Sequence, residues 1–298
     1  MVIYIANPVI LLYHDIVPFN VSVYIIYSEG KYTMNILNEF DVNDIHFRYA
    51  VDDSPDSRNF GLHIHDTCEI FYYIDGAAEY LVEGSVYPLA PGNLLIMRPG
   101  EAHCVRITSP VRYERFAVNF PLSLFDEIDP ERRLMTPFAE RTLGQGNIFL
   151  LSGLEGYFKD MISGKDSYEK RLRLTAGILH LLTLICSEYD LRKTEKPRKK
   201  NLSEQIASYV NEHLFEELSI PFLASEFYLS ESQFRRLFIR TTGAPPWEYI
   251  TAKRLNEANR LLREGVSAKE VSERCGFREY SSFYRAYKKR FGSCPRES

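Results

Sequence analysis

Cysteine is scarce in this sequence and is not grouped. The 298 residues include five cysteines, at positions 68, 104, 186, 275 and 294, and no two of them form a Cys-x-x-Cys pair. Disulfide frameworks and structural zinc sites need cysteines in even or closely spaced sets, so neither is expected here. Scattered free thiols indicate a reducing compartment, and we expect a cytoplasmic protein.

Long hydrophobic runs are lacking as well. The longest early apolar run, residues 9–13, is bounded by Pro8 and His14. A membrane-spanning helix needs about 20 apolar residues, and an export signal needs a basic start, which Met1-Val2-Ile3 does not provide. We therefore expect no membrane segment. The hydrophobic fraction of 45% is ordinary for a globular protein and excludes a disordered or collagen-like chain.

The two signs of charge are unevenly divided along the chain. Residues 198–298 carry 18 Lys and Arg against 13 Asp and Glu, a net charge of +5, whereas residues 1–197 carry 18 against 27, a net charge of −9. A chain of this length usually forms about two domains. An acidic domain joined to a basic one suggests two tasks, and the basic domain is where a polyanion would bind.

The acidic part has the pattern of a small β domain followed by a helix. Short β-rich runs at residues 69–75, 78–82 and 93–97 are separated by Gly76, Gly84 and Gly92, which favours a sandwich or small barrel over residues 1–151. Helical patterning over residues 152–191 is strongest at 169–189, where a broad apolar stripe could cover the barrel, face a second subunit, or do both. The charged run at 192–201 is interpreted as a solvated linker.

The basic part, residues 202–298, is helical and contains an internal repeat. Capping-box patterns begin at Asn201, Ser230 and Ser267. Two aromatic residues, a glycine and a proline occur with offsets of 0, 4, 9 and 12, and the same pattern recurs 49 residues later. In both copies, basic residues lie between the aromatic residues and the glycine. The two copies are Phe234, Phe238, Gly243, Pro246 and Phe283, Tyr287, Gly292, Pro295. Helix, tight turn and basic helix is typical of a helix-turn-helix unit, here written twice. Spacing alone leaves a helical bundle with solvated basic faces as the alternative.

Residues 202–297 resemble the AraC/XylS family of bacterial transcription regulators. The match rests on fixed spacings that include Ser230-x3-Phe234-x-Arg236-Leu237-Phe238, Gly243-x2-Pro246-x2-Tyr249, Arg254-x3-Ala258-x2-Leu261-Leu262 and Cys275-Gly276-Phe277-x5-Phe283-x-Arg285-x-Tyr287. The resemblance implies a pair of helix-turn-helix units in adjacent major grooves of double-stranded DNA, usually activating transcription with RNA polymerase as a partner. Ser298 stands where the family usually has Tyr, so the end of the second unit is expected to pack less well.

The resemblance also implies which residues contact DNA. The first recognition helix would be residues 231–241, and the second would begin near Glu279. The side chains expected at the DNA are Ser232, Arg235, Arg236, Arg240, Tyr280, Ser281, Ser282, Arg285 and Lys289. Those expected in the core are Phe234, Leu237, Phe238, Phe283 and Tyr287.

The acidic part holds a second motif, His63-x-His65-x3-Glu69, joined by the distant His103. Alternation along a strand would place His63 and His65 on one face, and two imidazoles with a carboxylate suit a first-row metal. The pattern resembles the signature segments of the cupin barrel, although the second segment has one extra residue. Cupin enzymes hold a metal with this set, whereas AraC-like sensory domains keep a similar skeleton, usually without metal, around a small effector. Three interpretations stay open: a metal site with ligands His63, His65, Glu69 and His103; an effector pocket of these residues and Tyr73; or a structural polar cluster.

Together these patterns predict a two-domain α+β protein. It would have an N-terminal cupin-like β-barrel with a helical dimerisation element and a C-terminal all-α double helix-turn-helix. We expect a homodimeric regulator that is not an enzyme, with no required cofactor, controlled by a small molecule for which a carbohydrate is the favoured class. The alternative is a metal-dependent cupin dioxygenase or isomerase fused to a DNA-binding domain.

Overall fold

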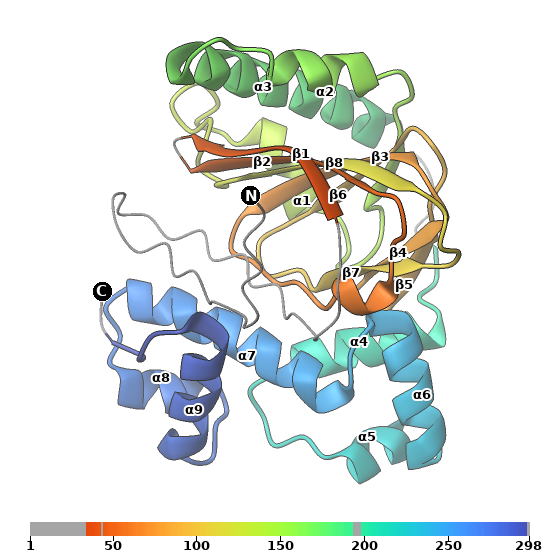
Figure 1. Ribbon diagram of the computed structural model, residues 1–298. Helices are drawn as coiled ribbons and strands as arrows, with labels where there is room; N and C mark the ends of the chain where they lie inside the picture. The colour runs from red at the N-terminus through yellow and green to blue at the C-terminus, as the bar shows by residue number, and fades with distance from the viewer. Residues whose placement is uncertain (1–33, 43, 193–197, 297–298) are drawn as a thin grey trace, which may run out of the picture.

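The computed structural model describes residues 34–42, 44–192 and 198–296, which form a β domain (residues 34–192) and a helical domain (residues 198–296) (Figure 1). The fold class predicted from the sequence is confirmed. Residues 1–33, the middle of the expected linker and Ser298 lie outside the described residues.

The β domain contains two antiparallel sheets. One has the strand order β1-β2-β8-β3-β6-β9 and the other has the order β5-β4-β7. The strands are β1 Met34–Val42, β2 Ile45–Asp52, β3 Cys68–Asp75, β4 Ala78–Val82, β5 Ser85–Pro88, β6 Asn93–Met97, β7 His103–Ile107, β8 Tyr113–Phe120 and β9 Ile148–Leu150. Short helical turns lie at η1 Ser57–Asn59, η2 Arg133–Met135 and α1 Thr136–Ala139.

Side chains of the large sheet alternate between two cores, as the period of a strand requires. On β3, Ile70 and Tyr72 belong to the core that faces the helices of the β domain, whereas Phe71 and Tyr73 belong to the core between the two sheets. Glu69 shares the inner face with Phe71. The inner face of this sheet is therefore where a site between the sheets can form.

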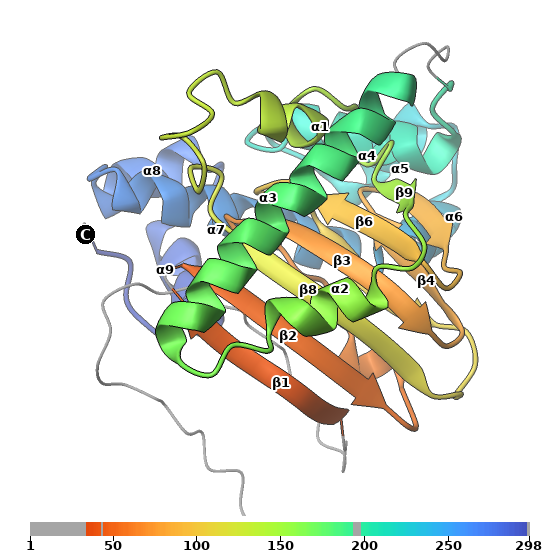
Figure 2. The ribbon, with the colours of Figure 1, turned by 90° about the horizontal axis from the view of Figure 1, so that it is seen from above.

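Helices α2 Glu155–Met161 and α3 Ser167–Arg192 cover the outer face of the large sheet (Figures 1 and 2). Helix α3 buries Leu174, Ile178 and Leu182 in the core beneath it and leaves Leu172 exposed. By length and composition α3 could cross a membrane, and a third of its most apolar window is buried in this core. One such helix is weak evidence for a membrane segment, because the core helix of a soluble domain passes the same test.

The helical domain lies on the side of the small sheet away from α3 (Figure 1). Its helices are α4 Leu202–Glu212, α5 Ile220–Glu226, α6 Glu231–Thr242, α7 Pro246–Arg263, α8 Ala268–Arg274 and α9 Tyr280–Phe291. Helices α6 and α9 both have 12 residues, both end at a glycine in the left-handed conformation, Gly243 and Gly292, and start 49 residues apart. The sequence repeat is therefore a structural repeat, with α7 between its two copies.

Each repeat has its own apolar core. Phe234 and Phe238 are buried among residues of α4, α5 and α7, and Leu237 packs at the edge of the same core. Phe283 and Tyr287 are buried with Leu262 and neighbouring residues of α7 and α8. The long helix α7 contributes to both cores, so it ties the two units together.

Candidate functional site

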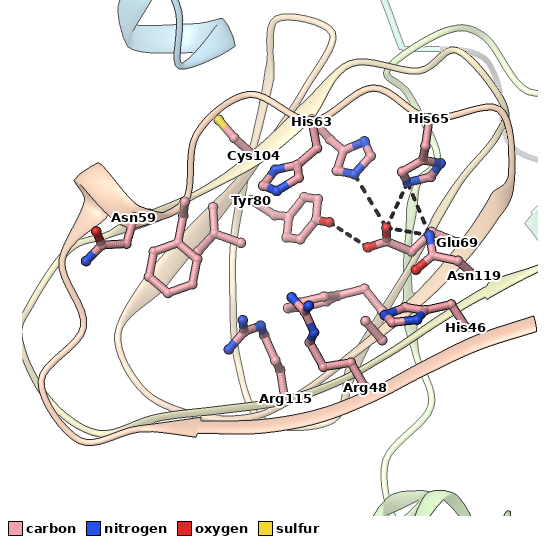
Figure 3. A pocket seen from close by; sticks show the side chains of 15 residues that line it. His46, Arg48, Asn59, His63, His65, Glu69, Tyr80, Cys104, Arg115 and Asn119 are labelled. Atoms are coloured by element: carbon pink, nitrogen blue, oxygen red, sulfur yellow. Dashed lines mark hydrogen bonds and ion pairs between the residues drawn. The ribbon is translucent and has the colours of Figure 1, made fainter. Parts of the chain in front are cut away.

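A cavity of about 90 Å³ lies between the two sheets of the β domain. Strands β2, β8 and β3 of the large sheet contribute one wall. Strands β4 and β7 of the small sheet, with the segment before β3, contribute the other. Figure 3 shows the side chains that line the cavity. The lining residues are His46, Arg48, Asn59, Phe60, His63, His65, Glu69, Phe71, Tyr80, His103, Cys104, Val105, Arg115, Ala117 and Asn119.

Glu69 is the centre of a hydrogen-bonded cluster in this cavity (Figure 3). Its Oε2 atom lies 2.9 Å from Nε2 of His65 and 3.5 Å from Nε2 of His103, and it accepts a hydrogen bond of 3.1 Å from Asn119 Nδ2. Its Oε1 atom accepts a hydrogen bond of 3.0 Å from the Tyr80 hydroxyl. Side chains from β4, β7, β8 and the segment before β3 thus fix the carboxylate of Glu69.

Burial and charge act in opposite directions on this cluster. Burial favours the neutral form of Glu69, but the charges and hydrogen bonds of His103 and His65 hold its pKa well below the ordinary value. Burial likewise opposes protonation of His103, yet the Glu69 carboxylate raises the pKa of that ring. Burial, with His103 nearby, lowers the pKa of His63 to about 3. These surroundings therefore favour the ionised form of Glu69 and the protonated form of His103, whereas burial favours the neutral form of His63.

In both His65 and His103, the ring nitrogen that faces Glu69 is Nε2. Nδ1 of His65 lies 2.9 Å from the Thr67 carbonyl, and Nδ1 of His103 lies 2.8 Å from the Glu101 carbonyl. A carbonyl only accepts, so each Nδ1 carries the hydrogen, and in a neutral ring Nε2 is then an acceptor. Both Nε2 atoms face Glu69, which is itself an acceptor. Asn119 Nδ2 lies 3.3 Å from Nε2 of His65 and can donate to it. A cation between the two rings and the carboxylate would also satisfy these lone pairs.

Three of the five residues predicted for the pocket form one close group, and the other two, His63 and Tyr73, do not belong to it. His65, Glu69 and His103 offer ligand atoms that all lie within 4.8 Å of one another, and His63 is not in that group. His63 lies outside any strand: it forms an isolated bridge with His103, and their rings stack with centroids 6.0 Å apart. Tyr73 is buried in the core between the sheets and does not line the cavity. His63 and His65 face the same side, as expected, because both line the cavity. The expected strand is wrong, because only a single bridge, at His63, pairs this segment.

Sequence reasoning missed the cationic side of the cavity. His46 and Arg48 come from β2, and Arg115 comes from β8; all three line the cavity, and their side chains extend into it (Figure 3). Arg48 also donates to Glu39, with Nε at 2.8 Å from Oε1. The period-two spacing of Arg115 and Asn119 along β8 could have marked both as residues of one face. Nothing in the sequence indicated that this face meets the histidines.

The nine residues predicted to contact DNA lie on α6 and α9, and all are exposed. On α6, the hydroxyl of Ser230 accepts a hydrogen bond from the Gln233 N–H, and the Gln233 side chain accepts one from the Ser230 N–H, so the helix starts with a full capping box. Arg235 forms an ion pair of 3.5 Å with Glu231. Helix α9 starts after Glu279, which makes no side-chain capping bond.

Comparison with known proteins matches both domains. Residues 48–182 match a family model described as an AraC-like ligand binding domain, and residues 223–298 match one described as a helix-turn-helix domain. The chain is 27% identical over 241 residues to the uncharacterized HTH-type transcriptional regulator YobQ of Bacillus subtilis, covering 80% of this chain and 89% of YobQ. It is 24% identical over 244 residues to the HTH-type transcriptional activator RhaS of Salmonella paratyphi A, covering 80% of this chain and 87% of RhaS.

A third relative matches over a shorter length. The probable transcriptional regulator LumQ of Photobacterium leiognathi is 35% identical over 91 residues, which cover 30% of this chain and 37% of LumQ. The chain therefore spans little more than a third of LumQ.

Proposed function

The chain belongs to the AraC family of DNA-binding transcription regulators with a ligand-binding domain, and we propose that its effector is a small hydroxylated molecule held in the cavity around Glu69. The observation that carries this proposal is the buried cluster of Glu69, His65, His103, Tyr80 and Asn119 at the wall of a cavity. Such a cluster offers both donors and acceptors to hydroxyl groups, which suits a carbohydrate.

The cationic wall of the cavity narrows the class of effector. Arg48 and Arg115 line the cavity opposite His63 and His103. They place positive charge beside the cavity, although the N-terminal part of the chain carries a net negative charge. A carbohydrate that also carries a carboxylate would match the arginines at one end and the cluster around Glu69 at the other. Sugar acids are therefore included with neutral sugars in the test.

A thermal-shift screen of neutral sugars, polyols and sugar acids tests the proposal. An effector should raise the melting temperature of the wild-type chain and of Glu79→Gln, because Glu79 pairs with Arg106 outside the cavity. It should leave the melting temperature of Glu69→Gln unchanged. A screen without any shift, or equal shifts in the two variants, would contradict the assignment of the cavity.

A divalent metal ion at the same cluster is a second candidate, favoured by the lone pairs that converge on Glu69. Two imidazoles and a carboxylate suit a first-row metal, which would offer open positions to an effector's hydroxyl groups. The donor atoms of His65, Glu69 and His103 fit this role because they lie within 4.8 Å of one another. The second nitrogen of each ring is fixed by a backbone carbonyl, as is usual for metal-bound histidines.

Cobalt(II) titration with visible spectroscopy tests the metal. The wild-type chain and His63→Ala should bind about one equivalent, whereas His65→Ala and His103→Ala should not. His63→Ala is the matched control, since the ring lines the cavity without belonging to the ligand group. No uptake by the wild type, or equal loss in all three variants, would remove the metal from the proposal.

For DNA binding, we propose that α6 and α9 enter adjacent major grooves of double-stranded DNA. Arginine on the exposed face of such a helix can donate to guanine or to phosphate.

We further propose that the protein acts in the cytoplasm as a homodimer that contacts RNA polymerase and activates transcription. The exposed side chains of Tyr168, Leu172 and Leu191 on α3 support a dimer contact there. The alternative of a fused cupin enzyme is not retained, because both matched family models and the relatives are those of transcription regulators.

A further inference from the structure

One wall of the cavity is also the surface on which the helical domain sits. This wall consists of residues 62–66 and 100–104, which meet at the bridge between His63 and His103. His63, His65 and His103 line the cavity. Between them, Ile64 and Ala102 are buried in the core of the first helix-turn-helix unit. The alternation of an extended chain thus assigns one face of the wall to the effector and the other to the helical domain.

Polar contacts fasten the same wall to α7 and α9. Arg263 of α7 forms an ion pair with Asp66. Nζ of Lys253, also on α7, donates a hydrogen bond of 2.8 Å to the carbonyl of Gly100. From α9, Arg290 donates to the Ile64 carbonyl at 3.3 Å. Both ends of the wall are therefore tied to helices of the second domain.

Glu83 is the buried centre of this interface. It is 2% exposed, and Oε1 accepts hydrogen bonds of 2.6 Å from Lys253 Nζ and from the Ala102 backbone N–H. Its Oε2 accepts from Asn211 Nδ2 at 2.8 Å and from the Tyr249 hydroxyl. A carboxylate that binds the wall and two helices at once makes their positions interdependent, because each buried partner that is lost leaves charge uncompensated.

The first recognition helix is held at its C-terminal end. The thiol of Cys104, a residue that lines the cavity, lies 3.6 Å from the Thr242 carbonyl at the end of α6. Arg106 of the same strand donates to the Arg240 carbonyl. The exposed residues at the start of α6 stay clear of these contacts.

We infer that residues 62–66 and 100–104 are the element that couples the effector cavity to the DNA-binding helices. The inference rests on the proposed function, because it takes the cavity to be the binding site of the effector. Close packing means that a ligand which displaces His63, His65 or His103 also displaces Ile64 and Ala102 against the helical domain. Coupling between two sites is reciprocal, so DNA binding must in turn alter this wall, whether or not the effector is known.

Hydrogen–deuterium exchange of the full chain tests the coupling with DNA alone. The probe is a duplex selected from a random-sequence pool by the wild-type protein. DNA should change the exchange of peptides that cover residues 62–66 and 100–104, and leave α2, on the far side of the large sheet, unchanged. Changes confined to α4–α9 would overturn the inference.

A matched pair of variants on α7 sharpens the test. Arg263→Gln removes the ion pair with Asp66, whereas Arg260→Gln removes ion pairs with Glu257 and Glu264 inside the same helix. Arg263→Gln should reduce the DNA-dependent difference at the wall by about half or more, and Arg260→Gln should preserve it. Equal behaviour of the two variants would overturn the coupling role.

Lys253→Met removes the buried cation and provides a second, stronger variant. It should raise the exchange of the wall without DNA and abolish the DNA-dependent difference. Unchanged exchange at the wall in this variant would also overturn the inference. These readouts do not need an effector, so a failed sugar screen would remove the proposed effector class and leave the coupling result standing.

Discussion

At the scale of single residues, the two domains use charge in opposite ways. In the helical domain Arg236 and Arg285 lie exposed on helix surfaces, where a DNA partner can reach them. In the β domain Glu69 and His103 are buried, and each stabilises the charged form of the other. Exposed charge is available to a partner, whereas buried charge fixes a local geometry.

Replacing Arg236 or Arg285 with alanine should weaken binding to a specific duplex. If the arginine contacts a base, the loss should be roughly 1–3 kcal/mol at the specific site and smaller on random DNA. Fluorescence anisotropy on both duplexes measures the difference. An equal loss on the two would show that the residue contacts phosphate only.

Cys104 should act as a reporter of the contact between the domains. Burial raises the pKa of its thiol to about 12, so alkylation at pH 8 should be very slow in the wild type. Lys253→Met should speed alkylation of Cys104, because the thiol lies against the end of α6.

Mass spectrometry after timed labelling separates the cysteines. Cys68 is the control, since burial raises its pKa to about 12 as well but it lies in the core under α3. Faster labelling of both thiols would indicate general unfolding of the variant rather than an opened interface.

At the scale of elements, local capping chemistry sets the ends of the helices. Asn201 and Ser230 form full capping boxes at α4 and α6. Ser267 accepts from the Glu270 N–H at α8, without the reciprocal bond that its sequence pattern suggests. The starts of these helices could be predicted because the residues that cap a helix are its immediate neighbours in sequence.

Ser230→Ala should destabilise the first recognition helix by about 1 kcal/mol, because the N–H of Gln233 loses its acceptor. Ser230→Asp keeps a capping oxygen and should retain most of that stability. Chemical denaturation followed by circular dichroism measures both variants. Equal unfolding free energies for the alanine variant and the wild type would contradict the role of the cap.

At the scale of the whole molecule, Gly243 and Gly292 distinguish a local from a tertiary requirement. Both end a recognition helix with positive φ, 79° and 71°. A Cβ atom at Gly292 would meet nothing within 4 Å, whereas one at Gly243 would lie 2.2 Å from the Cys104 thiol. The same helix-ending residue thus has an added role where α6 docks on the β domain.

Gly292→Ala should cost about 1 kcal/mol of unfolding free energy, from the left-handed backbone alone. Gly243→Ala should cost a further 1–3 kcal/mol or so, because the new methyl group overpacks the interface. Adding Cys104→Ala should recover much of that extra cost, since the Cβ of Cys104 would lie 3.6 Å away. Denaturation midpoints of the three variants measure the effect, and equal midpoints for the two glycine variants would contradict the clash.

The sequence by itself determined the local architecture of this protein. It showed the repeat, the helix starts and the faces of α6 and α9, because hydrogen bonds in a helix join residues three or four positions apart. It also grouped His65, Glu69 and His103, together with His63. Only the tertiary structure set His63 apart from the three side chains whose donor atoms lie within 4.8 Å of one another, brought Arg48 and Arg115 to the cavity, and joined Glu83 to Lys253. These contacts join residues on different strands or domains, and local spacing does not determine which faces of distant segments meet.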